Sequence, residues 1–138
     1  MSATLVDSNI LLDVIKDDAK WKHWSLRQLM ASADQGDVLV NPMIYAEIAA
    51  GFAQDHDLAS FLKDIGIELV DLPWKAAFMA GHKHSQYRRS GGARERTLPD
   101  FIIGAHAVIK ELRLVTRDAQ PYRSYFPQLE LIAPDTHP

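Results

Sequence analysis

The sequence of 138 residues contains no cysteine. Without thiols the chain forms neither disulfides nor thiolate metal sites, so any bound metal must take oxygen or imidazole ligands. Long apolar runs are also missing, and the N-terminus lacks the charged start, apolar middle and small-residue cleavage site of a secretory signal. We therefore expect no membrane role and a cytoplasmic location.

The amino-acid composition is that of an ordinary globular protein. Hydrophobic residues make up 47% of the chain and charged residues 24%, which excludes a disordered or fibrous class. A chain of 138 residues falls in the usual range of one domain and is long enough to bury a sizeable core. We predict a single domain over residues 1–138.

Charge is unevenly distributed along the chain. The net charge of −3 argues weakly against a nucleic-acid partner, because phosphate binding usually requires a basic surface. Residues 1–72, however, carry 12 acids and 5 bases, whereas residues 73–138 carry 6 acids and 10 bases. Half of the later bases lie in residues 82–96, the basic segment: Lys83, Arg88, Arg89, Arg94 and Arg96. This clustering favours contact with the phosphates of RNA over a plain solvated surface.

Strand and helix patterns alternate along the sequence. Short apolar runs predict strands at residues 3–6, 38–40, 67–72, 112–116 and 129–133. Helices are expected near residues 9–15, 21–33, 42–53, 57–65, 100–111 and 119–125, and from residue 74 into the basic segment. Ser8 or Asn9 is expected to cap the first helix. Because parallel neighbours need crossover helices, we predict a three-layer α/β/α sandwich with a central, mainly parallel sheet of four to five strands.

Four acids should meet at one edge of this sheet. Asp7 follows the first strand and Asp118 the fourth, while Glu47 and Asp100 lie near the starts of helices that begin at the same edge. Ligands of such sheets bind outside the carboxyl ends of the strands. Because the neighbours of Glu47 are apolar, we expect it to be surrounded by apolar groups, where an unpaired acid would be costly. Taken singly, Asp7 is also explained as a helix cap, and Asp100 by the helix dipole.

Clustered carboxylates favour a divalent cation. Like charges a few ångströms apart raise one another's pKa or require a cation, and hard oxygen ligands favour Mg²⁺, with Mn²⁺ as a substitute. Such an ion lowers the pKa of an attacking water and stabilises a departing 3′ oxygen. The site therefore predicts hydrolysis of a phosphodiester bond.

The order of these motifs resembles that of PIN-domain ribonucleases. VDSN at the end of a strand, the glutamate of NPMIYAE, LPD at a helix start and the late TRD follow the family's order over essentially the whole chain. The resemblance implies that the catalytic and metal-binding acids are Asp7, Glu47, Asp100 and Asp118. It also implies polar support from Ser8, Asn9 and Thr116.

Among PIN proteins, a short single-domain chain is similar to the VapC toxins of type II toxin–antitoxin pairs. This resemblance implies a Mg²⁺-dependent endoribonuclease that cuts structured RNA, such as transfer or ribosomal RNA. It further implies a homodimer and a small antitoxin whose C-terminal segment occupies the active-site groove. With such a partner, the basic segment is expected to contact either RNA or acidic residues of the antitoxin.

Two other functional hypotheses are based on the same acids. A receiver-like Mg²⁺-binding signalling domain without nuclease activity would explain Asp7 and Thr116, but it leaves Glu47 and Asp100 unused and offers only Asp71 as a poor phospho-acceptor. An acid-phosphatase-like enzyme requires an aspartate where Asn9 stands. The histidines lack pairing motifs, so we assign no catalytic role to His82, His84 or His106.

Overall fold

The computed structural model describes residues 2–92 and 96–138. The strands in these ranges are β1 (Thr4–Val6), β2 (Val38–Val40), β3 (Ile67–Leu69), β4 (Arg113–Val115) and β5 (Leu131–Ile132). The helices are α1 (Ser8–Ile15), α2 (Lys22–Gln35), α3 (Pro42–Ile48), α4 (Asp55–Asp64), α5 (Trp74–Arg89), α6 (Leu98–Ile109) and α7 (Gln120–Arg123), with a 3-10 helix, η1 (Ala49–Gly51), after α3. None of the helices described is long and apolar enough to cross a membrane.

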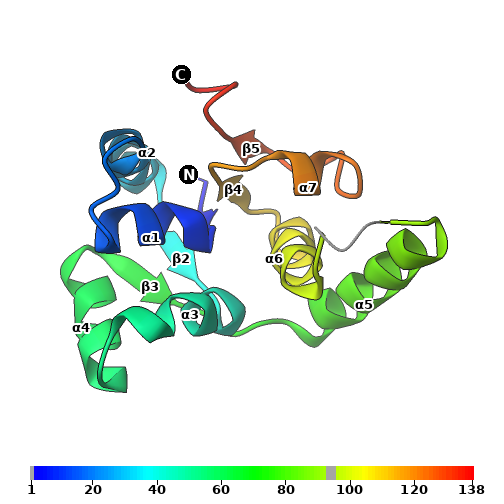
Figure 1. Cartoon of the computed structure of the whole chain (residues 1–138), viewed down its shortest axis with the longest axis horizontal. Coiled ribbons are helices and arrows are strands. Elements are labelled where there is room, and N and C mark those ends of the chain that lie inside the picture. Colours follow the sequence, from blue (N-terminus) through cyan, green and yellow to red (C-terminus); the bar gives the residue numbers. More distant parts are fainter. Residues whose placement is uncertain (1, 93–95) are drawn as a thin grey trace.

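The strands form one parallel sheet with helices on both faces. Their order is β3-β2-β1-β4-β5, and every neighbouring pair is parallel. Figure 1 shows α1, α2 and α4 on one side of the sheet and α5, α6 and α7 on the other. Helical crossovers join the parallel strands, as parallel pairing requires. The predicted α/β/α sandwich with a parallel sheet is confirmed.

The strand β1 occupies the middle of the sheet. Its Leu5 lies opposite Leu39 of β2 on one side and opposite Leu114 of β4 on the other. From β1 the chain moves outward through β2 and β3, then returns past β1 to form β4 and β5. Such a reversal leaves a crevice outside the carboxyl ends of the strands that flank it. The crevice here lies at the ends of β1 and β4.

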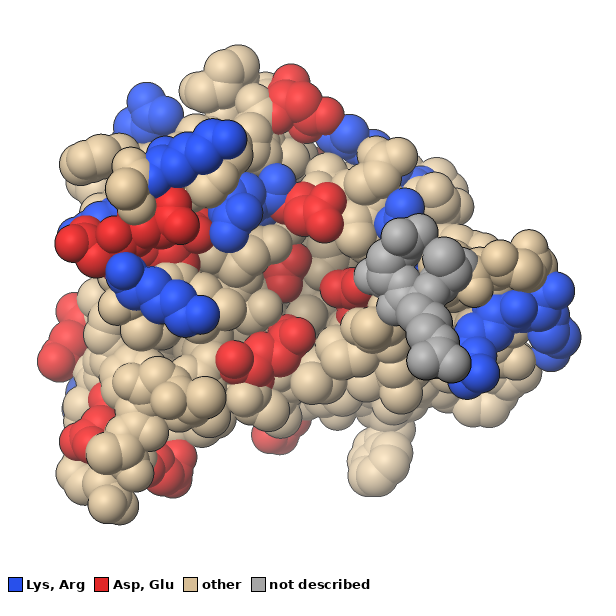
Figure 2. All heavy atoms as spheres, viewed as in Figure 1, with Lys and Arg blue, Asp and Glu red and all other residues tan. Residues whose placement is uncertain are grey.

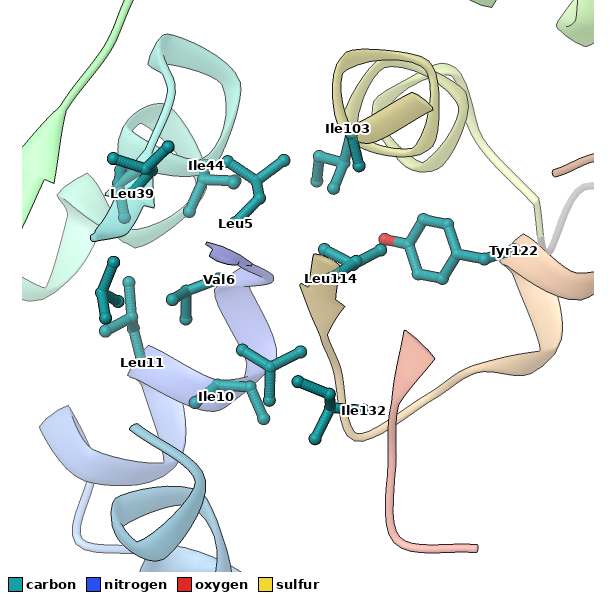
Figure 3. Packing of buried hydrophobic residues seen from close by; sticks show 14 of the residues in the cluster. Leu5, Val6, Ile10, Leu11, Leu39, Ile44, Ile103, Leu114, Tyr122 and Ile132 are labelled. Carbon is teal, nitrogen blue, oxygen red and sulfur yellow. The ribbon is translucent and has the colours of Figure 1, made fainter. Parts of the chain in front are cut away.

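The hydrophobic core holds the helices of both layers to this central region. All residues of β1, β2 and β4 are buried. Figure 3 shows Leu5, Leu39 and Leu114 of the strands facing Ile44 of α3 and Ile103 of α6, all of them buried. Burial of a leucine or isoleucine side chain stabilises a fold by roughly 1.5–3 kcal/mol. These contacts therefore fix the helices that carry acids relative to the sheet.

The strand β3, within the predicted strand at residues 67–72, lies at one edge of the sheet. Ile67 is buried, whereas Glu68 and Leu69 are exposed. Exposed side chains suit an edge position, because central parallel strands are covered on both faces.

Two local features differ from prediction. Asp7, rather than Ser8 or Asn9, caps α1, because its Oδ1 accepts the Ser8 N–H at 2.7 Å. The expected Ser8 or Asn9 cap is therefore wrong, whereas the helix-cap explanation of Asp7 is confirmed. The third helix is also shorter than expected. It ends at Ile48, and the chain continues in the 3-10 helix η1. Gly51 disfavours a longer α-helix there, since glycine costs about 1 kcal/mol relative to alanine in a helix interior.

Candidate active site

The four predicted acids lie around the crevice at the ends of β1 and β4. Asp7 follows β1 directly, and Asp118 follows β4 shortly after its last residue. Glu47 belongs to α3 and Asp100 to the first turn of α6. In Figure 2, acidic side chains gather around a hollow in the middle of this face. Sequence elements far apart in the chain thus bring the acids to one place.

Asp7 is the buried centre of the site, with only 6% of its surface exposed. Its Oδ2 accepts hydrogen bonds from the Thr116 and Tyr122 hydroxyls, each at 2.8 Å, and a longer one of 3.5 Å from Asn9 Nδ2. Within the described residues, its Oδ1 accepts only the Ser8 N–H. A carboxylate oxygen has two lone pairs. The lone pairs of Oδ2 are therefore occupied by hydrogen bonds, whereas Oδ1 can still bind a further donor or a cation.

The charge of Asp7 is incompletely compensated by its surroundings. Burial raises the pKa of Asp7, because an enclosed carboxylate loses its hydration. Hydrogen bonds from Tyr122, Thr116 and the Ser8 backbone act in the opposite direction, and the nearby charge of Asp118 raises the pKa further. The ionised form of Asp7 would gain from a cation.

Glu47 is more open to water than the sequence predicts. Ile44 and Ile48 form the buried side of α3, but Glu47 is exposed, so the expectation that apolar groups surround it is wrong. Its pKa is still raised, first by partial loss of hydration and then by the charge of Asp7. A hydrogen bond with Ser8 lowers the pKa of Glu47 again. Glu47 therefore lies at the solvent-exposed side of the same crevice.

Asp100 has both a structural and an electrostatic role. Its Oδ2 accepts the Thr97 N–H at 3.4 Å, which caps the start of α6. Loss of hydration raises the pKa of Asp100, the Thr97 hydrogen bond lowers it, and the charges of Asp7 and Asp118 raise it. Asp100 lies in the first turn of α6, where the helix-dipole explanation from the sequence places it, and it also lies within electrostatic range of the other acids.

None of the four acids forms an ion pair with a described lysine or arginine. With the side chains in these positions, no three acids or histidines among the described residues form a preformed metal-binding site. Mg²⁺ does not require one, because it commonly binds one or two carboxylates and keeps several waters. The donor set, which is all carboxylate oxygen, is of the kind that Mg²⁺ prefers.

The polar residues predicted as support connect the end of β4 to the start of α1. Thr116 donates to Asp7 and accepts the Asp118 N–H at 3.1 Å. Asn9 donates to Thr116 Oγ1 at 3.2 Å and accepts the Arg117 N–H at 3.1 Å. These bonds orient the Asp7 carboxylate and hold the loop that carries Asp118. Ser8 contributes its backbone N–H to Asp7.

Tyr122 was not predicted from the sequence. Figure 3 shows its ring reaching from α7 toward β4 with the hydroxyl leading. The side chain is 1% exposed, and burial followed by the charge of Asp7 holds its pKa well above the ordinary value. Tyr122 therefore stays protonated and acts as a hydrogen-bond donor to Asp7. The only signal in the sequence is an aromatic residue in the short helix after TRD.

A buried ion pair beside the site was also not predicted. Asp13 is 2% exposed, and its two carboxylate oxygens accept from Arg117 Nε and Nη2, each at 3.0 Å. Ser25 Oγ donates to the same carboxylate at 2.7 Å. The pair anchors Arg117, the residue between Thr116 and Asp118. Its sequence signals are the second aspartate of VDSNILLD and the arginine of TRD.

The basic segment lies beside the crevice at the α5–α6 connection. Lys83, Arg88 and Arg89 belong to the second half of α5, and Arg96 precedes α6. Basic side chains lie over the end of α5, at the right of Figure 2. Arg94 lies outside the described residues. Contact of this segment with RNA or an antitoxin stays a prediction.

His106 lies in the core rather than among the acids. It is buried in α6, and its Nδ1 accepts from Asn41 Nδ2 at 2.9 Å. Burial lowers the pKa of His106, which favours the neutral ring that this hydrogen bond requires. The Oδ1 of Asn41 caps α3 by accepting the Ile44 N–H. His106 thus supports the helix that carries Glu47.

Comparisons with known proteins point to one family. Residues 4–127 match the family model of the PIN domain. Among solved structures, VapBC2 from Rickettsia felis bound to a promoter DNA fragment has a chain that is 20% identical, with 95% of this chain and 98% of that chain covered and a TM-score of 0.71. A toxin–antitoxin complex from Klebsiella pneumoniae is 19% identical, with 94% and 95% covered and a TM-score of 0.68. FitAcB from Neisseria gonorrhoeae is 16% identical, with 94% and 96% covered and a TM-score of 0.66. No curated protein matches the sequence. At these identities, the likeness to the solved structures concerns the fold.

Proposed function

The chain belongs to the PIN-domain family, and on this premise we propose that it is a metal-dependent endoribonuclease and the toxin of a toxin–antitoxin pair. The observation that carries the proposal is the meeting of Asp7, Glu47, Asp100 and Asp118 at one crevice. Loss of hydration and their mutual charges raise the pKa values of Asp7, Glu47 and Asp100. No described basic side chain pairs with any of the four.

Mg²⁺, or Mn²⁺ in its place, is the cofactor that we propose. Asp7 through Oδ1, together with Asp100 and Asp118, would hold the hydrated ion. When bound, the ion would lower the pKa of a water and neutralise charge that develops on the phosphate. Thr116 and Tyr122 would keep the Asp7 carboxylate oriented throughout, since both donate to Oδ2.

Glu47 is suited to accept a proton from the attacking water. It is exposed on the crevice side of α3, and its pKa is raised by loss of hydration and by Asp7. A carboxylate with a raised pKa is a stronger base than a free glutamate. The Ser8 hydrogen bond orients the Glu47 side chain. The proton for the departing oxygen would come from solvent.

The proposed partners follow from the structural neighbours. The solved structures with this fold include VapBC and FitAB assemblies and a complex described as toxin–antitoxin. By analogy, we propose that an antitoxin binds this chain, that the chain forms a homodimer, and that its substrate is structured RNA such as transfer or ribosomal RNA. A cytoplasmic location belongs to the same proposal.

The receiver-like alternative lacks a phospho-acceptor at the crevice. Asp71 is exposed and follows β3, which is the edge strand on the β2 side of the sheet. The crevice lies at β1 and β4, so Asp71 and Asp7 follow strands that are not neighbours. This placement favours the nuclease over the signalling function.

Incubation of total cellular RNA with the purified protein tests the proposal. Reactions contain Mg²⁺ or a chelator, and sequencing maps new RNA ends. We expect discrete Mg²⁺-dependent cuts with wild-type protein and with Asp64→Asn, a control at an exposed position of α4. Asp7→Asn should abolish them. Absence of cleavage by folded, antitoxin-free protein, or full cleavage by folded Asp7→Asn, would overturn the proposal.

A further inference from the structure

The basic segment divides into two groups in the structure. Lys83 Nζ lies 5.4 Å from the centre of the Phe126 ring, and Arg89 Nη1 donates to Ser85 Oγ at 3.2 Å. These two cations are engaged by neighbouring side chains. Arg88 and Arg96, in contrast, line a common cavity between the end of α5 and the start of α6.

This cavity, which we call the arginine pocket, has a volume of about 380 Å³. Its walls are formed by His84, Tyr87, Arg88, Gly92, Arg96, Thr97 and Leu98. Two of these side chains are permanently cationic, and none of the described residues that line the pocket is an acid. A volume of this size accommodates a phosphate with its sugar neighbours. The pocket is therefore shaped and charged for an anion.

Arg96 gives the pocket an unused hydrogen-bond donor. Its Nη1 is buried and has no hydrogen-bond partner among the described residues. Arg113 also has a buried nitrogen without a partner, but its other two nitrogens bind Gln35 at 2.9 Å and Thr4 at 2.8 Å. No hydrogen bond joins Arg96 to the described part of the chain. A buried donor without an acceptor costs about 1–3 kcal/mol, which an acceptor in the pocket would remove.

The arginine pocket is also close to the acid cluster. The positive charge of Arg96 lowers the pKa of Asp100, so the guanidinium lies within electrostatic range of that carboxylate. Thr97, another pocket residue, donates its N–H to Asp100. The pocket and the crevice are thus joined through residues 96–100. A polyanion bound at the acids would continue past Arg96.

We propose that the arginine pocket binds a backbone phosphate of the RNA substrate, next to the phosphate that is cleaved. The identity of the ligand as RNA rests on the proposed function. Arginine suits this role because its guanidinium presents planar pairs of N–H donors that match phosphate oxygens. Phosphate contacts of this kind fix the register of a nucleic acid and do not read its sequence.

RNA binding in an Asp7→Asn background tests this inference without cleavage. A short fluorescent RNA hairpin is titrated with protein at several salt concentrations, and anisotropy gives the dissociation constant. Arg96→Gln and Arg88→Gln should each weaken binding about tenfold and reduce the slope of log K against log salt by about one. The matched control is Lys75→Gln, at an exposed position near the start of the same helix and outside the basic segment, which should leave the slope unchanged.

One further variant and a test of folding separate the possible outcomes. Arg96→Lys keeps the charge and should restore part of the salt slope, although it loses the paired donors. Thermal melting of each variant checks that the fold is retained. Equal slopes for the Arg96, Arg88 and Lys75 variants would overturn the inference, as would loss of antitoxin binding with unchanged RNA affinity.

A failure of the proposed function can be recognised separately. If the Asp7→Asn protein binds no RNA at all, inorganic pyrophosphate is titrated while the amide resonances of residues 96–98 are followed by NMR. Shifts that disappear in Arg96→Gln support a phosphate pocket without the RNA assignment. Absence of such shifts in the parent protein would overturn the pocket itself.

Discussion

Tyr122 donates a hydrogen bond to Asp7 Oδ2 at 2.8 Å across 115 residues of sequence. Thr116 donates to the same oxygen at the same distance. Together they restrict rotation of the Asp7 carboxylate and leave its Oδ1 to interact with other groups. The geometry of the crevice therefore depends on α7, the shortest α-helix of the described chain.

Tyr122→Phe should shift the pH dependence of cleavage. The Tyr122 hydrogen bond stabilises ionised Asp7 and so lowers its pKa; its removal should raise the pKa of Asp7 further. Because protons compete with Mg²⁺ for this carboxylate, the acidic limb of the pH–rate profile should move to higher pH, while the rate above that limb stays near wild type.

Tyr125→Phe is the matched control for this change. Tyr125 belongs to the same segment, where its ring packs against Phe101 and Tyr87. The pH–rate profile of Tyr125→Phe should coincide with that of wild type. Identical profiles for Tyr122→Phe and wild type would show that the hydroxyl does not tune Asp7.

Without metal, stability should fall as pH rises toward neutrality. The pKa values of Asp7, Glu47 and Asp100 are raised in the folded protein, so the folded state binds more protons than the unfolded state in this window. The stability that these three acids contribute through their bound protons is fully present below the ordinary carboxylate pKa of about 4. It is lost as pH rises through the raised pKa values of the folded protein.

Mg²⁺ should counteract this loss of stability at higher pH. Melting temperatures measured with chelator and with Mg²⁺ between about pH 4 and 7 should separate progressively as pH rises, because the ion binds the deprotonated acids. Asp7→Asn removes a major contributor and should flatten the chelator curve. Parallel curves for wild-type protein with and without Mg²⁺ would contradict a carboxylate metal site.

Arg117→Ala should destabilise the fold by about 2 kcal/mol in urea unfolding. Loss of one partner leaves Asp13 as an unpaired buried charge, an effect of roughly 3–5 kcal/mol for fully buried pairs. The effect is smaller here because the Arg117 side chain is 32% exposed. Asp13→Asn in the same protein removes that charge and should recover part of the lost stability. Additive effects of the two changes would mean that the pair is not coupled.

Asn41→Ala should cost about 1–2 kcal/mol of stability, because the α3 cap and the contact with His106 are both lost. Asn41→Asp keeps the cap oxygen but removes the donor to His106. Equilibrium unfolding of the two variants separates these contributions. An Asn41→Ala protein as stable as wild type would show that α3 does not depend on this cap.

Much of the fold and the order of the acids were predictable because they follow from local rules. The strands are short and mostly apolar, and Asp7 follows β1 directly while Asp118 follows β4 shortly after its last residue. Asn41 and Pro42 mark the start of α3 in sequence as they do in the structure. Parallel pairing then brings the carboxyl ends of β1 and β4 together, and with them the acids.

The remaining parts of the site depend on side-chain contacts that local patterns do not specify. Tyr122 and Tyr125 are three residues apart, and only the packing of α7 against β4 determines which phenol reaches Asp7. Glu47 has small or apolar neighbours in sequence, yet one face of α3 is covered and Glu47 lies on the open one. The unpaired donor of Arg96 likewise depends on how α5 and α6 meet.

The order of the strands also determines when the site can form during synthesis. A ribosome releases Asp7 early, but the hydroxyls that orient it, on Thr116 and Tyr122, emerge 109 and 115 residues later. Until then β1 has no β4 to pair with, and the nascent chain has an incomplete crevice. A message cut short before α7 therefore yields a chain without the oriented carboxylate. Each newly made molecule therefore has an incomplete crevice for almost the whole of its translation.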